Sequence, residues 1–127
     1  MSSNVVVFGK KPPGDIYFSR WEKALDRLNP RVECDILFEK ESTIYFYIYS
    51  TKNFKTDLLK MLLIKMDNKG VMFPKIEVEQ TLDVDVDPNY NAVRGKIVVY
   101  KAGQYYVRVF SPNEPKKPVA ESELLID

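Results

Sequence analysis

The stretch Thr43–Ser50, with the sequence TIYFYIYS, constrains the fold of this chain more than any other segment. Two sets of side chains alternate along it, Ile44, Phe46 and Ile48 in one set and Tyr45, Tyr47 and Tyr49 in the other. Successive side chains of an extended chain point to opposite sides, so a period of two is typical of a β-strand. The pattern therefore predicts a strand with one side in the core and a row of tyrosines on its other side.

The residues before this strand predict two further strands and a helix. Val5–Phe8 is a short β-branched run that ends at a glycine, which is typical of a buried strand. Asp15 is a candidate N-cap, and apolar residues then recur at spacings of three and four, which predicts a helix over residues 15–28. From residue 31 to 38 the period returns to two. We expect this segment to form a hairpin with Thr43–Ser50.

A second helix is predicted over residues 53–68. Leucine, isoleucine and methionine are frequent in this segment, and Asn68, Lys69 and Gly70 follow as a typical helix C-terminus. The apolar side chains cover a wider arc than one buried stripe of a helix requires. The segment Lys75–Leu82 that follows reads as another strand.

Together these elements predict an α+β domain with a mostly antiparallel sheet and two helices. Their order, strand-helix-strand-strand-helix-strand, is that of the ferredoxin-like arrangement. Val93–Tyr100 and Gln104–Phe110 predict an additional C-terminal hairpin. The length of 127 residues fits one domain. Residues 111–127 are either an extended tail or packed on the domain, and residues 94–126 also allow interpretation as a separate small barrel-like unit.

Composition removes several kinds of chemistry. The chain has no histidine, which is the usual general base and a common zinc ligand, and its one cysteine has no partner for an internal disulfide. The 19 basic and 18 acidic side chains nearly balance. No apolar run approaches the roughly 20 residues of a membrane helix. We expect a soluble intracellular protein of the cytoplasm or nucleus, without a cofactor or metal and without membrane contact.

Three aspartates offer the one pattern that is similar to a metal-binding loop. Asp83, Asp85 and Asp87 alternate as the first ligands of an EF-hand loop do. However, Pro88 stands where that loop needs glycine and Arg94 where it needs glutamate. The pattern favours an exposed acidic edge that discourages strand pairing between molecules.

The absence of a catalytic constellation favours a non-enzymatic binding or regulatory protein that acts through protein contacts. Its partner would be another protein or a second copy of this chain. Candidate contact residues are apolar or aromatic and come from the tyrosine row, the second predicted helix and the C-terminal segment: Tyr45, Tyr47, Tyr49, Leu59, Leu63, Met66, Leu124 and Leu125.

The alternative function is binding of single-stranded RNA or DNA. Tyr45, Tyr47 and Tyr49 could stack on bases, with Lys10 and Lys11 contacting phosphates. One observation counts against it, because the predicted hairpin would place three carboxylates beside the tyrosines, those of Glu33, Asp35 and Glu39. An enzyme that uses only Asp, Glu, Tyr and Lys is a third hypothesis.

Overall fold

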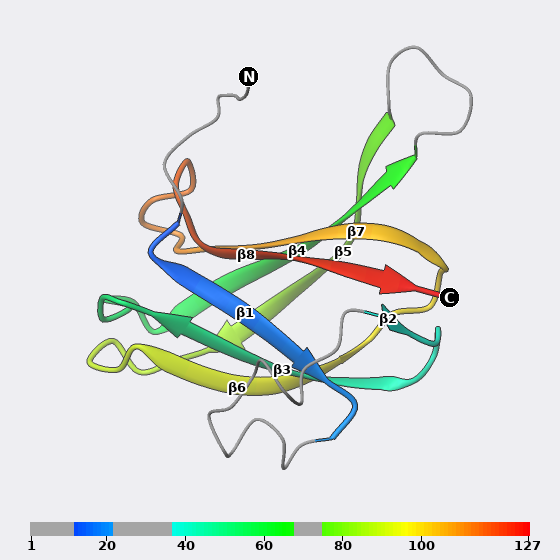
Figure 1. The fold of residues 1–127 in the computed structure, drawn as a ribbon. Helices are drawn as coiled ribbons and strands as arrows, with labels where there is room; N and C mark the ends of the chain where they lie inside the picture. The colour runs from blue at the N-terminus through cyan, green and yellow to red at the C-terminus, as the bar shows by residue number, and fades with distance from the viewer. Residues whose placement is uncertain (1–11, 22–36, 68–74) are drawn as a thin grey trace.

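The computed structural model is all-β in the part of the chain that it describes, residues 12–21, 37–67 and 75–127 (Figure 1). Those residues hold eight strands and no helix. The strands are β1 (Gly14–Ser19), β2 (Leu37–Phe38), β3 (Thr43–Ser50), β4 (Leu58–Asp67), β5 (Lys75–Asp85), β6 (Ala92–Val98), β7 (Gly103–Phe110) and β8 (Pro118–Ile126). The predicted α+β class is therefore wrong.

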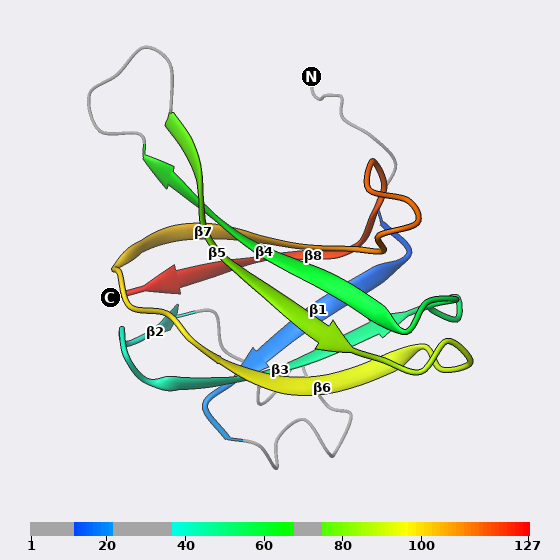
Figure 2. The ribbon, with the colours of Figure 1, turned by 180° about the vertical axis from the view of Figure 1, so that it is seen from behind.

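All the strands belong to one sheet, in the order β5-β4-β7-β8-β1-β3-β6, and β2 pairs with β8. Most neighbours are antiparallel, whereas β8 is parallel to both β1 and β2. The sheet curls so that β1, β3 and β6 lie across the core from β5, β4 and β7, and it is nearly closed (Figures 1 and 2). We call β1, β3 and β6 the front layer, and β5, β4, β7 and β8 the back layer.

Side chains bridge the two ends of the sheet, β5 and β6. The amide Nε2 of Gln80 in β5 donates a hydrogen bond of 3.1 Å to the carbonyl oxygen of Val98 in β6. Beside it, Nζ of Lys101 lies 3.0 Å from Oε1 of Glu79. Among the described residues, β5 and β6 are thus linked at this seam by side chains and not by a strand ladder.

The space between the layers is filled by alternate side chains of the strands. Ile44, Phe46 and Ile48 of β3 are at most 1% exposed, which confirms the predicted strand and its buried side. Large side chains from the back layer meet them, including Leu59, Met61, Leu63, Tyr105, Val107 and Leu124. Burial of this apolar surface is the main force that holds the layers together.

The second predicted helix is strand β4. Leu59, Met61 and Leu63 are fully buried, and the residues between them face the outside of the barrel. Because Leu62 and Ile64 on that outer side are also apolar, the segment has apolar residues on both sides of a strand. Apolar residues on both sides of a strand give the same wide arc when they are placed on a helix, so the predicted helix is wrong.

The first predicted helix is also wrong over the residues that can be compared. Gly14–Ser19 forms β1, with Ile16 and Phe18 in the core. It pairs with β3 along all six residues, and Gly14 and Asp15 also pair with β8. Residues 22–28 lie outside the described part, as do the predicted strand Val5–Phe8 and Cys34.

Over the residues that the structure describes, the strand pairs of the two predicted hairpins are not formed. β6 pairs with β3, and β7 pairs with β4 and β8, so residues 99–102 cross from the front layer to the back layer. β2 pairs with β8 instead of β3. The C-terminal segment forms β8, which has neighbouring strands on both sides, and Leu124 is fully buried there. In the described ranges no helix has the length and apolar character to span a bilayer.

Candidate functional site

The outer side of the front layer carries the predicted tyrosine row, extended by side chains from both neighbouring strands. Tyr47 stands between Tyr17 of β1 and Arg94 of β6. Tyr45 stands beside Lys96, and Tyr49 stands beside Asp15. We call this surface the tyrosine face; it consists of Tyr17, Tyr45, Tyr47, Tyr49, Arg94 and Lys96.

The aromatic rings of this face are packed against one another. The rings of Tyr17 and Tyr47 are stacked, with centroids 6.5 Å apart and planes inclined by 19°. Burial raises the pKa of Tyr47, and the nearby Tyr49 raises it further. Tyr49 is 40% exposed. The face therefore offers both a preformed ring stack and an open aromatic side chain.

The charges beside the tyrosines differ from those that the sequence predicted. The neighbours of β3 are β1 and β6, and β6 presents two exposed cations, Arg94 and Lys96. Glu39 lies in the turn before β3, and residues 33 and 35 are outside the described part. Of the predicted partner strand, the described residues Leu37 and Phe38 pair with β8. The described carboxylate in register with a tyrosine of this face is that of Asp15.

A second surface, the outer side of the back layer, is apolar. In register across it, Ile64 of β4 lies between Val78 of β5 and Tyr106 of β7. Leu125 of β8 is the partner of Leu37 in β2. We call this surface the apolar face; it consists of Leu37, Leu62, Ile64, Met66, Val78, Tyr106 and Leu125. Val78 is 56% exposed, Leu37 49% and Tyr106 36%, so solvent reaches a substantial part of it.

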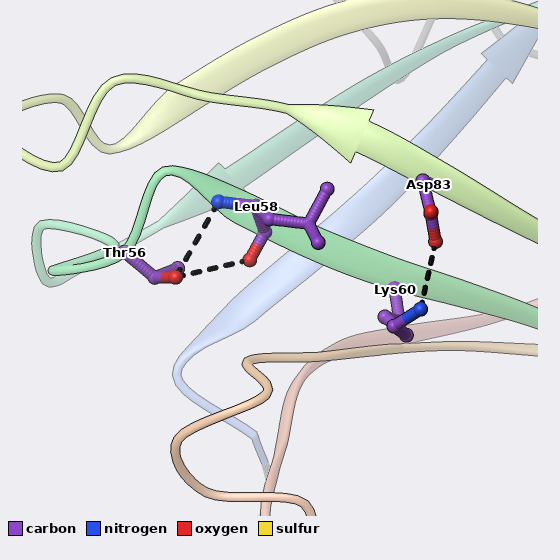
Figure 3. A network of polar contacts seen from close by, with 4 residues as sticks. All are labelled: Thr56, Leu58, Lys60 and Asp83. Atoms are coloured by element: carbon purple, nitrogen blue, oxygen red, sulfur yellow. Dashed lines mark hydrogen bonds and ion pairs between the residues drawn. The ribbon is translucent and has the colours of Figure 1, made fainter.

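Charged side chains surround the apolar face and are paired with one another. Nζ of Lys60 lies 3.0 Å from Oδ1 of Asp83, between β4 and β5 (Figure 3). Nε of Arg108 lies 3.3 Å from Oε2 of Glu121, between β7 and β8. Burial raises the pKa of Tyr106, and the adjacent Glu123 adds to this rise. The border of the face thus carries both signs of charge in neighbouring positions.

The predicted contact residues divide between surface and core. Met66 and Leu125 lie on the apolar face, and the three tyrosines lie on the tyrosine face. The side chains with no exposed area, which belong to the core, are Leu59, Leu63 and Leu124. Lys10 and Lys11 are outside the described residues.

The sequence prediction missed several members of both faces: Tyr17, Arg94, Lys96, Val78 and Tyr106. The alternation in each strand carried a signal for them. Strand pairing brings the members of each face together, and the sequence does not state this pairing.

The aspartates of the EF-hand-like pattern are engaged separately. Asp83 pairs with Lys60, and Oδ1 of Asp87 accepts a hydrogen bond of 2.9 Å from the backbone N–H of Asn89. Within residues 12–21, 37–67 and 75–127, no three Asp, Glu or Cys side chains are grouped as metal ligands.

Comparison with known proteins shows no family. No protein-family model matches the chain. No curated protein matches its sequence.

Solved structures have distant likenesses to it. An immunoglobulin-like protein from Pseudomonas aeruginosa is 12% identical, with a TM-score of 0.47 over 94% of this chain and 100% of that one. A superoxide reductase (neelaredoxin) from Ignicoccus hospitalis is 11% identical, with a TM-score of 0.44 over 94% and 83%. A DNA-bound alkylpurine DNA glycosylase from Pseudomonas fluorescens is 12% identical, with a TM-score of 0.43 over 94% of this chain and 32% of that one.

Proposed function

We propose that this protein is a non-enzymatic binding protein that holds a partner protein on its apolar face. The observation that supports the proposal is the row of apolar side chains across β5, β4 and β7. Ile64 is the cross-strand partner of Val78 on one side and of Tyr106 on the other. Leu125 and Leu37 form a second apolar pair on β8 and β2, and the exposed Gln104 stands between Leu125 and Met66.

Exposed apolar surface of this kind is unfavourable in water and is typical of interaction sites. Each square ångström of apolar surface removed from water contributes about 25 cal/mol, which is partly offset by the freedom that the two partners lose on association. Sheet faces that are left to solvent usually carry polar side chains, whereas here the central positions of the face are aliphatic or aromatic. A partner that covers Val78 and Tyr106 would gain this energy.

The border of the face favours a protein as the partner. Protein interfaces combine an apolar centre with a polar rim. The pairs Lys60–Asp83 and Arg108–Glu121 supply such a rim, and because their charges compensate, they create little net attraction for a polyanion or an anionic membrane. The matching surface of the partner is expected to be apolar and open, with polar groups at its edge.

The test uses a charge placed in the middle of the exposed part of the face. Val78→Lys introduces an ammonium group at a side chain that is already 56% exposed, so the barrel should tolerate it. Thr43→Lys is the matched control, since Thr43 is an exposed position of the front layer. Sedimentation velocity over a range of concentrations first measures whether the protein associates with itself.

If the chain is monomeric, partners are identified by crosslinking in native cells and the complex is rebuilt from purified components. We expect the dissociation constant of the rebuilt complex, or of the self-associated form, to increase at least tenfold with Val78→Lys and to stay unchanged with Thr43→Lys. Equal binding by Val78→Lys and the wild type would overturn the proposal, as would failure to rebuild any complex.

A further inference from the structure

We propose that the tyrosine face is a second binding site, for a single strand of nucleic acid. This ligand is additional to the partner protein, and the site lies on the opposite layer of the barrel from the apolar face (Figures 1 and 2). The inference rests on three features of the face: the spacing of its aromatic side chains, the cations in register with them, and the position of its carboxylate.

The aromatic side chains form a row along one strand. Tyr45, Tyr47 and Tyr49 are alternate residues of β3, so their Cα atoms follow one another at about 6.6 to 6.8 Å. Proteins that bind single strands without strict sequence preference place successive bases on aromatic side chains of a sheet in this way. The stack of Tyr17 on Tyr47 widens the platform toward β1.

Two cations stand beside this row, where phosphates would lie. Lys96 is the cross-strand partner of Tyr45, and Arg94 is that of Tyr47. Both side chains are exposed. At such a position the base can stack on the aromatic ring and the phosphate can contact the cation.

Asp15, at the border of the tyrosine face, determines on which side of the face the phosphates of a bound strand lie. Asp15 lies on the β1 side, beside Tyr49, whereas both cations lie on the β6 side. Phosphates are attracted to the cations and repelled by Asp15. The sugar-phosphate backbone is therefore expected along β6, with the bases over β3 and toward Tyr17.

These features favour single strands over duplexes. Bases in a duplex are stacked on each other and expose only their edges, so they cannot lie on tyrosine rings. With two phosphate contacts the logarithm of the affinity should fall with the logarithm of salt with a slope of about −1.4.

The experiment measures fluorescence anisotropy of a labelled single-stranded oligothymidine of about 20 nucleotides. A second probe is an abasic strand of the same length, which has the phosphates and lacks the bases. An unlabelled duplex serves as competitor. We expect saturable binding of the oligothymidine, at least tenfold weaker binding of the abasic strand, and weak competition by the duplex.

Variants on the two layers locate the site. Tyr49→Leu keeps an apolar side chain at an exposed position and removes the ring, and it should weaken binding about tenfold. Lys96→Gln should reduce the salt slope by about 0.7. Tyr106→Leu and Arg108→Gln are the matched controls on the back layer, and both should bind as the wild type does. Circular dichroism and the thermal midpoint verify that each variant is folded.

Three results would overturn the proposal. The first is the absence of saturable binding at low salt, and the second is equal affinity for the oligothymidine and the abasic strand. The third is an equal loss of binding in the variants of the two layers. Failure of this experiment leaves the apolar face and its Val78→Lys test untouched, because the two surfaces share no residue.

Discussion

The ring of Phe46 in β3 covers the backbone of Gly95 in β6. The two residues are direct partners in the antiparallel register, and a Cβ placed on Gly95 would lie 2.9 Å from Cε2 of Phe46 and closer still to Cζ. Phe46 is 1% exposed and has core side chains around it. The space above Gly95 is therefore part of the core packing, and it fixes β6 with Arg94 and Lys96 on the outside.

Gly95→Ala should destabilise the fold by about 1 to 3 kcal/mol, because the added methyl group pushes Phe46 into a filled core. Urea unfolding followed by tyrosine and tryptophan fluorescence measures this change. Lys96→Ala, on the next residue and on the outer side, is the control and should change the free energy of unfolding by less than about 0.5 kcal/mol.

A smaller side chain at position 46 should relieve the overlap. The double variant Phe46→Leu, Gly95→Ala is expected to lose less stability than the sum of the two single losses, since the leucine leaves room for the methyl group. Strict additivity, or a wild-type stability for Gly95→Ala, would contradict the contact between the ring and the glycine.

Part of this architecture could be predicted from the sequence, namely the strand whose two sides differ in chemistry. In β3 the buried residues are Ile and Phe and the outer ones are Tyr, so period two was visible and the strand was confirmed. In β4 both sides are apolar, as Leu63 and Ile64 illustrate, and leucine and methionine also favour helices. This segment is a strand because it pairs with β5 on one side and with β7 on the other.

The candidate site was less predictable, because each face is made by pairing across the sheet. The residues Lys101, Ala102 and Gly103 read as a hairpin turn, yet they connect strands in different layers. Consequently Lys96 faces Tyr45 in β3 and has no partner in β7. A local pattern identifies which residues point outward, whereas long-range register decides which of them meet.

A second glycine marks the junction of the two layers. Gly14 pairs with Ser50 in β3 and with Ala120 in β8, and a Cβ there would lie 2.8 Å from the carbonyl oxygen of Val119 and closer to that of Tyr49. Backbone atoms on both sides cannot move away as a side chain can. Gly14→Ala should therefore cost more stability than Gly95→Ala in the same urea titration, and the reverse order would contradict this packing.

The turn that leads into β4 contains a buried hydroxyl, that of Thr56. Further along β4, Lys60 forms an exposed ion pair with Asp83 of β5 (Figure 3). Oγ1 of Thr56 donates a hydrogen bond of 3.1 Å to the carbonyl oxygen of Leu58 and accepts one of 3.4 Å from its N–H. Thr56 is 9% exposed, whereas the side chains of Lys60 and Asp83 are 46% and 58% exposed.

Thr56→Ala should lower the free energy of unfolding by about 1 kcal/mol, because it leaves buried backbone groups without their partner. Lys60→Ala should change it by less than about 0.5 kcal/mol, since water screens an exposed ion pair. Thermal unfolding of both variants tests the contrast. A larger loss with Lys60→Ala would show that the ion pair, rather than the turn, holds β4 and β5 in place.

The stability of the barrel should also depend on pH in the alkaline range, through Tyr105. Its ring is fully buried in the core, and its hydroxyl donates a hydrogen bond of 2.7 Å to the carbonyl oxygen of Lys101 in the connection between the layers. Burial raises the pKa of Tyr105 above the usual 10.0, and the nearby Glu79 raises it further. The folded state therefore favours the neutral phenol.

The sign of the pH dependence follows from that shift. In the unfolded chain the phenol ionises near pH 10, whereas in the folded chain it ionises only at higher pH. The stabilisation is fully present below pH 10 and is lost as the pH rises through the folded pKa.

Tyr105→Phe should cost about 1 kcal/mol at pH 7, because it removes the hydrogen bond of the phenol. It should also lose less stability than the wild type between about pH 10 and 11. Urea midpoints measured across this range, with Tyr100→Phe at an exposed position as control, test both effects. Parallel declines in the wild type and Tyr105→Phe would assign the alkaline unfolding to other groups.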